Sequence, residues 1–153
     1  MTAVDDRPAS EVGTARKRKE DARLITGRTK WTDNIQLPGM LHLAMVRSPF
    51  AHATIDAIDT SAAAASPGVI AVFTGADLAD SQGVNINAWP IAPDQVTPTH
   101  LPVAVERVAC AGEIVAVVAA RSAAAARDAV ELVGGEWGEL AAVPDLKEAA
   151  AAA

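Results

Sequence analysis

The apolar residues of this sequence fall into short runs with the length of β-strands, and this pattern limits the possible folds more than any other feature. The longest run covers residues 114–120 and is followed, after Ser122, by alanines with helical spacing. A second continuous run covers residues 69–73, and strands of this kind are usually covered on both faces. Neither run approaches the ~20 apolar residues that a membrane-spanning helix needs. We therefore expect a two-layer α/β domain of modest size, with no membrane span.

Turn and capping residues divide the rest of the chain into further short elements. Residues 40–47 alternate between two faces, as expected of a strand, and residues 53–59 alternate again. Asp59 or Thr60 can cap an alanine helix over residues 61–65, because their side chains accept hydrogen bonds from free backbone N–H groups. The expected architecture is a mixed sheet with short helices packed against it.

Glycines set the ends of other elements. A short helical turn over residues 20–25 should stop at Gly27, and the helix after Ser122 should stop at Gly134 and Gly135. Residues 136–140 then form a last, frayed strand, because a glycine inside a strand costs about 0.5–1 kcal/mol. We expect a single hydrophobic core made by the strands. Its predicted members are Leu41, Leu43, Val69, Ile70, Val72, Phe73, Ile114, Val115, Val117 and Val118.

Charge and composition argue against nucleic-acid binding. The 13 basic and 19 acidic residues give a formal net charge of −6, whereas phosphate affinity needs clustered Lys and Arg. One basic run, residues 16–19, is interrupted at once by Glu20 and Asp21, and we interpret it as a solvated or partner-facing segment. Three Trp, two Phe and no Tyr supply few platforms for stacking bases.

The beginning of the chain and its cysteine content favour a cytoplasmic location. The first twenty residues are polar and charged, so they contain no apolar segment of a secretory signal. Cys110 is the only cysteine, which excludes an internal disulfide and fits a reducing compartment.

Candidate catalytic side chains do not converge in the sequence. His42, His52 and His100 are far apart and lack metal-ligand spacing, and we interpret His52 as a turn histidine that bonds to nearby backbone. Cys110 has no histidine near it in sequence, so a buried or half-buried thiol is expected rather than a nucleophile.

Serines and acidic pairs also have structural explanations. Turns or helix caps account for Ser48, Ser61 and Ser122. Exposed salt bridging is the expected role of the pairs Glu20/Asp21 and Glu136/Glu139. Because no nucleophile, base and oxyanion site come together, we assign no catalytic, cofactor-binding or metal-binding residue to this chain.

Several longer phrases, taken in order, resemble the large subunits of molybdenum hydroxylases. The resemblance covers roughly residues 14–145. Its phrases are RKEDARLITG at residues 18–27, LPGMLH at 37–42, VRSPFAHA at 46–53, IDTSAA at 58–63, PGVIAVFTGADL at 67–78, and GEIVAVVA at 112–119 after RV at 107–108. The family includes xanthine dehydrogenases, aldehyde oxidases and aerobic carbon monoxide dehydrogenases, and WTDNI at residues 31–35 looks most like the carbon monoxide dehydrogenase branch.

The resemblance implies a fold and a molecular setting. The matching region is the α/β hammerhead domain that precedes the cofactor-binding part of the large subunit. In the assembled complex a molybdopterin cofactor would perform hydroxylation, and iron–sulfur clusters would pass electrons to FAD. The expected partners are the cofactor-binding remainder of the large subunit, the iron–sulfur subunit and an FAD subunit. Cys110 does not match the active-site cysteine loop of the carbon monoxide enzymes, so it inherits no role.

The sequence therefore predicts a flexible leader at residues 1–14, a hammerhead domain at residues 15–146, and an alanine-rich tail at residues 147–153. The leading hypothesis is a non-catalytic structural domain of a molybdenum-hydroxylase large subunit, present as a fragment or split subunit. Residues 47–52 and the 81–102 loop are the expected contact regions. The alternative hypothesis is a stand-alone, non-catalytic interaction or assembly module.

Overall fold

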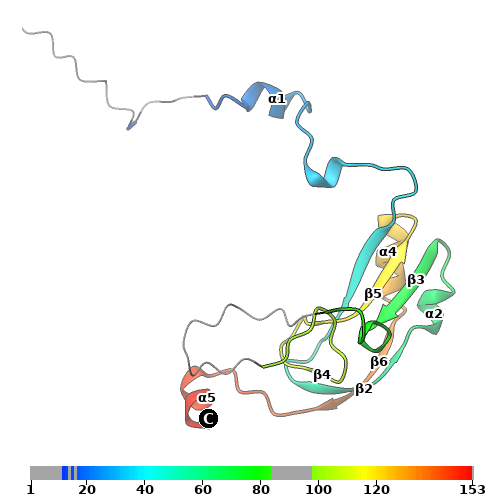
Figure 1. The fold of residues 1–153 in the computed structure, drawn as a ribbon. Helices are drawn as coiled ribbons and strands as arrows, with labels where there is room; N and C mark the ends of the chain where they lie inside the picture. The colour runs from blue at the N-terminus through cyan, green and yellow to red at the C-terminus, as the bar shows by residue number, and fades with distance from the viewer. Residues whose placement is uncertain (1–11, 14, 16, 84–97, 153) are drawn as a thin grey trace, which may run out of the picture. The chain divides into compact units, whose positions relative to one another are not determined.

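The structure is a computed structural model of the chain, and it describes residues 12, 13, 15, 17–83 and 98–152. Two compact units make up the chain, Met1–Pro38 and Gly39–Ala153. Figure 1 shows the fold with its element labels. No helix in the described ranges is both long enough and apolar enough to cross a membrane.

In the first unit, the described residues form two short helical segments. Helix α1 spans Asp21–Ile25 and a 3₁₀ turn, η1, spans Thr32–Asn34. The Arg18 guanidinium lies 3.1 Å from the Asp21 carboxylate, and α1 ends just before Gly27, whose φ is +68°. The predicted helical turn is thus confirmed. Neither α1 nor η1 contains a buried residue, so these segments have no core of their own.

Two antiparallel sheets form the second unit (Figure 1). One has the strand order β1-β5-β3 and the other the order β4-β2-β6. The strands are β1 (His42–Arg47), β2 (Ala53–Asp59), β3 (Val69–Thr74), β4 (Arg107–Val108), β5 (Ile114–Ala120) and β6 (Gly134–Glu139). The helices are α2 (Ser61–Ala64), α3 (Gly75–Leu78), α4 (Ala123–Val130) and α5 (Leu146–Ala152). The α/β class is confirmed, but these strands form two antiparallel sheets rather than one mixed sheet.

Side-chain caps explain where the helices begin. The Ser122 hydroxyl accepts the N–H of Ala125 at 3.1 Å and starts α4, as predicted. The Asp59 carboxylate accepts the N–H of Ser61 at 2.9 Å before α2, so Asp59 rather than Thr60 supplies that cap. The pKa of the Asp59 carboxyl lies below its usual value, mainly because it accepts a hydrogen bond from the Ser61 hydroxyl and secondly because it accepts one from the Ser61 N–H.

Helix α3 begins in a reciprocal capping box at the end of β3. Asp77 accepts hydrogen bonds from the Thr74 N–H at 2.8 Å and from the Thr74 hydroxyl at 2.7 Å. The Thr74 hydroxyl in turn accepts the N–H of Asp77 at 3.3 Å. The bonds from Thr74, the backbone one first, lower the pKa of the Asp77 carboxyl.

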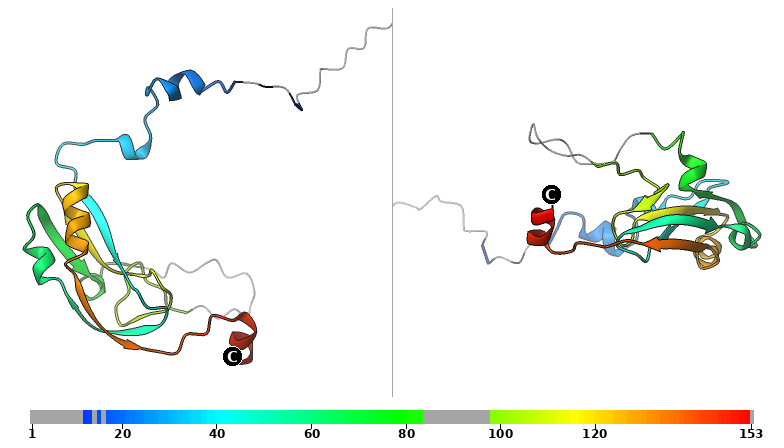
Figure 2. Two further views of the ribbon diagram at one scale, coloured as in Figure 1. Left: turned by 180° about the vertical axis from the view of Figure 1, so that it is seen from behind. Right: turned by 90° about the horizontal axis from the view of Figure 1, so that it is seen from below.

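Two separate hydrophobic clusters replace the single predicted core. One, between α4 and the β1-β5-β3 sheet, is built on Ala63, Val118 and Ala129, all 0% exposed. In Figure 1 α4 lies behind β5, and in the reversed view of Figure 2 it lies in front. The second cluster joins Ala53, Ala104, Val108 and Val115, with Trp137 packed against it.

Four of the ten predicted core residues lie where they were expected, and Ile114 and Val117 are half-buried. Val115 and Val118 are buried, and Val69 and Val72 pack against the α4 cluster. The prediction is wrong for four others, because their side chains lie on the surface: Leu41 is 42% exposed, Leu43 64%, Ile70 47% and Phe73 42%. Alternation identified two faces of residues 40–47 correctly, but the inward face carries His42, Ala44 and Val46 instead.

The last strand is longer than predicted and starts at the glycines that were expected to precede it. Gly134 and Gly135 pair with Asp59 and Ile58 of β2. A side chain at Gly135 would meet the Trp137 indole nitrogen at 2.7 Å, so glycine leaves room for that ring over the strand. Trp137 also packs against Phe50, with ring centroids 5.7 Å apart. Aromatic packing therefore compensates for the low strand propensity of the glycines.

Candidate functional site

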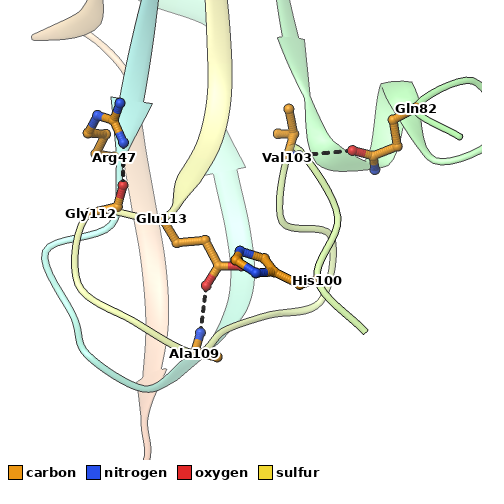
Figure 3. Close-up of polar contacts among 7 residues, drawn as sticks. All are labelled: Arg47, Gln82, His100, Val103, Ala109, Gly112 and Glu113. Carbon is orange, nitrogen blue, oxygen red and sulfur yellow. Dashed lines mark hydrogen bonds and ion pairs between the residues drawn. The ribbon is translucent and has the colours of Figure 1, made fainter. Parts of the chain in front are cut away.

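Polar contacts between side chains and backbone gather around the start of β5, and Figure 3 shows them. We call this group the Glu113 cluster and define it as Arg47, Gln82, His100, Val103, Ala109, Gly112 and Glu113. Its members come from the end of β1, from the segment after α3, and from the residues between β4 and β5. The cluster is the place where several predicted contact residues meet.

Glu113 is the centre of the cluster. Its side chain is only 8% exposed, and its carboxylate accepts the N–H of Ala109 at 2.7 Å. The other carboxylate oxygen lies 3.6 Å from Nε2 of His100 (Figure 3). Glu113 therefore joins the segment before β5 to the segment that carries His100, and a largely buried carboxylate of this kind is stabilised by such partners.

Arg47 and Ser48 attach the end of β1 to the same turn. The Arg47 guanidinium donates to the carbonyl of Gly112 at 2.7 Å, and Gly112 has a φ of +87° that favours glycine. Backbone hydrogen bonds link Ser48 to Gly112 and to Glu113, each at 2.9 Å. Buried Ser48 also exchanges hydrogen bonds with Phe50 at 3.0 Å, which confirms its predicted role in a turn.

Gln82 extends the network toward α3. Its side-chain oxygen accepts the N–H of Val103 at 2.9 Å (Figure 3), and the N–H of Ala104 donates to the Ile114 carbonyl at 2.8 Å. The described ends of the predicted 81–102 loop are thus fixed to one another and to β5. Residues 84–97 of that loop lie outside the described residues.

A hollow of about 480 Å³ lies beside the cluster. Its lining residues are His52, Pro98, Thr99, His100, Arg107, Ala109, Cys110 and Glu113. His52 does bond to the backbone, but its partner is not a neighbour in the turn: it is the carbonyl of Ala141, which lies 2.8 Å from Nδ1 and is distant in sequence. The prediction of a buried or half-buried Cys110 is wrong, because this residue stands exposed in the turn before Gly112.

The chemistry of the donors does not fit a metal centre or a molybdenum cofactor in this hollow. In residues 17–83 and 98–152, no three His, Cys, Asp or Glu side chains come together as metal ligands. The Arg47 guanidinium, which would suit an anionic group, already donates to Gly112, and the Glu113 carboxylate would repel one. We therefore derive no catalytic step through these residues, and the expectation that catalysis lies outside this chain stays a prediction.

The structure keeps the other predicted candidates apart from this cluster. His42 lies within β1, and Ser122 caps α4. Glu136 and Glu139 are exposed on β6. Sequence reasoning missed Glu113 as the organising residue, although a lone acid directly before an uncharged strand is a visible signal.

The arrangement of two antiparallel sheets with α4 on one of them is that of an α/β hammerhead domain. Residues 26–141 match the family profile described as "Aldehyde oxidase and xanthine dehydrogenase, a/b hammerhead domain". This match covers well over half of the chain, so the chain belongs to that family.

Large subunits of known enzymes support the same assignment. The nicotine 6-hydroxylase large subunit of Paenarthrobacter nicotinovorans is 45% identical over 134 residues, which are 88% of this chain and 16% of that protein. The carbon monoxide dehydrogenase large chain of Afipia carboxidovorans is 40% identical over 134 residues, with the same two shares. The chain therefore spans about 16% of the length of these relatives.

Solved structures agree in fold as well as in sequence. Quinoline 2-oxidoreductase from Pseudomonas putida 86 superposes with a TM-score of 0.80 at 45% identity, over 90% of this chain and 17% of that one. A Cu,Mo-containing CO dehydrogenase superposes with a TM-score of 0.74 at 39% identity, over 90% of this chain and 16% of that one. The predicted resemblance to molybdenum hydroxylases is confirmed.

Proposed function

We propose that this chain is a non-catalytic structural domain of a cytoplasmic molybdenum-hydroxylase large subunit, carbon monoxide dehydrogenase-like, that packs against the molybdopterin-binding remainder and the iron–sulfur subunit. An FAD subunit completes the proposed complex. The observation that carries the proposal is the match over 88% of this chain to only 16% of its relatives. The hammerhead region is thus one part of a much longer enzyme chain in those proteins.

The Glu113 cluster supports a structural role. Its charged groups are engaged with the chain itself, Glu113 with Ala109 and His100, and Arg47 with Gly112. A substrate site would need polar groups aimed at a ligand, whereas these groups hold loops to the start of β5. These contacts tie the end of β1 and the segments that carry His100 and Ala109 to the start of β5.

Metal analysis of the purified chain tests this proposal. An affinity-tagged chain is isolated from the cells that produce it, and molybdenum and iron are measured per mole of tagged chain. Association with the remainder and with the iron–sulfur subunit predicts both metals, together with the corresponding polypeptides. Recovery of the tagged chain without either metal would favour the stand-alone assembly module instead.

A second measurement addresses catalysis directly. The 153-residue chain, purified free of every other polypeptide, is assayed with a purine, an aldehyde and carbon monoxide and a soluble electron acceptor. We expect no turnover, because the described residues contain no group of three His, Cys, Asp or Glu side chains that could hold a metal ion. Turnover or tightly bound molybdenum in that sample would contradict the proposal.

A further inference from the structure

The β1-β5-β3 sheet has one covered face and one apolar face whose large side chains the described residues leave exposed or half-buried. The strand register places Met45, Val117 and Phe73 side by side across the three strands. Leu43 lies two residues before Met45 on β1 and therefore on the same face. We call Leu43, Met45, Phe73 and Val117 the open face. Leu43 is 64% exposed, Met45 44% and Phe73 42%, and Val117 is half-buried between them.

The opposite face shows what a covered surface of this sheet looks like. The register places Ala44, Val118 and Val72 side by side there, beneath α4, and Val118 is 0% exposed. In Figure 1 α4 lies behind β5, so the open face is the one turned toward the reader. The two faces of one sheet therefore differ in burial but not in polarity.

The sequences of β3 and β5 suit strands that are covered on both faces. Strands with one solvated face alternate apolar and polar residues, whereas Val69–Thr74 and Ile114–Ala120 are apolar at almost every position. The open face carries no charged or polar side chain among its four members. Apolar patches of this kind on a folded domain mark interaction sites.

We propose that the open face docks an apolar surface of the cofactor-binding remainder of the large subunit. This inference rests on the proposed function, and it assigns the contact to one face of one sheet. The relatives supply the reason for this occupant. The matched regions span 88–90% of this chain but only 16–17% of the relatives, which are therefore much longer. Permanent contacts between parts of one enzyme are more apolar than transient ones and resemble a domain core.

The rim of the open face is consistent with such a contact. Arg47 follows Met45 on β1, and its guanidinium lies 3.9 Å from the Met45 sulfur while it donates to Gly112. This cation is therefore already hydrogen-bonded, and it stands at the edge of the apolar residues rather than among them. A polar rim around an apolar centre is typical of specific interfaces.

The test compares two leucines that are exposed in different places. Leu43→Lys puts a charge on the open face, whereas Leu132→Lys puts the same charge just after α4, at a leucine that is 46% exposed. Each tagged variant and the unchanged chain are isolated from producing cells, and molybdenum per mole of tagged chain is measured. We expect Leu43→Lys to lower molybdenum recovery at least roughly tenfold and Leu132→Lys to change it less than about twofold.

Thermal unfolding of each isolated chain shows whether a loss comes from the contact or from the fold. If Leu43→Lys unfolds below the growth temperature, Phe73→Ser on the other outer strand replaces it in the comparison. If the Leu43→Lys chain recovers molybdenum to within about twofold of the unchanged chain, the inference is overturned while the proposed function stands. Absence of molybdenum from the unchanged chain would overturn both.

Sedimentation of the isolated chain tests the other occupant, a second copy. A monomer is expected at micromolar concentration. A dimer that Leu43→Lys dissociates and Leu132→Lys leaves intact would assign the open face to self-association and overturn the inference.

Discussion

The two faces of the β1-β5-β3 sheet use different apolar residues. The covered face meets α4 and α2 mainly through valines and alanines. Val118 of β5, Ala63 of α2 and Ala129 of α4 are all 0% exposed there. The open face carries larger side chains such as Leu43 and Phe73, which remain 64% and 42% exposed. Small residues let a helix approach a sheet closely, whereas large ones give area to a surface that is covered from elsewhere. Side-chain size therefore distinguishes the inside of this domain from its expected interface.

Two neighbouring valines of β5 give the strongest test of this difference. Val118→Asp places an unpaired charge in a site that is 0% exposed, and we expect it to cost at least about 4 kcal/mol or abolish cooperative unfolding. Val117→Asp on the open face should cost about 1–2 kcal/mol, because that side chain is only half-buried. Urea denaturation measures both. Equal losses would mean that the faces do not differ as described.

Enlarging an alanine of α4 sharpens the contrast. Ala129→Leu adds volume where the helix contacts the sheet at 0% exposure, and overpacking of this kind costs about 1–3 kcal/mol. Ala124→Leu is the matched control, since Ala124 is exposed on the same helix. The control should change the free energy of unfolding by less than about 0.5 kcal/mol. If Ala129→Leu lowers the free energy of unfolding no more than Ala124→Leu does, α4 packs loosely on the sheet.

Removal of the α4 cap has a smaller effect. Ser122→Ala leaves the N–H of Ala125 without its hydroxyl acceptor, and the expected loss is about 1 kcal/mol. Ser122→Asp should retain most of the stability, because aspartate also caps helices well. Thermal unfolding of the three chains gives the comparison. An equal loss in both variants would assign Ser122 a role other than capping.

The smallest expected effect is a response to acid at the end of the sheet. The capping box of Thr74 and Asp77 lies directly at the end of β3, so we expect an acid response there. Hydrogen bonds from the N–H and then the hydroxyl of Thr74 hold the pKa of Asp77 below its usual value of 3.8, so its contribution to stability is present above pH 3.8 and is lost as pH falls through the folded pKa. Asp77→Asn should therefore be less stable than the unchanged chain at pH 6, and the difference should shrink below pH 3.8. A difference that is constant with pH would contradict this assignment.

The sequence predicted which segments form strands and helices better than it predicted their faces. Capping residues such as Ser122 and Asp59 act locally, so their roles could be read from neighbouring positions. Leu41 and Leu43 were assigned to the core, yet both are exposed, and the register with β5 places Leu43 opposite Ala119 on the same face as Met45. Register depends on pairing between segments distant in sequence, which a single sequence does not specify.

The candidate site was predictable only in part. Residues 47–52 and the described ends of the 81–102 loop do meet, but the residue that joins them, Glu113, stood out only after the fold brought Ala109 and His100 to it. Cys110 was expected to be a buried or half-buried thiol, whereas it stands exposed in the turn before Gly112. Exposure in a turn is a tertiary property that neighbours in sequence do not determine.

The exposure of Cys110 has a practical consequence. It is the only cysteine of the chain, and it lies between β4 and β5, outside the three strands that carry the open face. A maleimide fluorophore would therefore attach at one defined position without an engineered thiol. Fluorescence anisotropy of that label would follow assembly of the chain into a larger particle in real time.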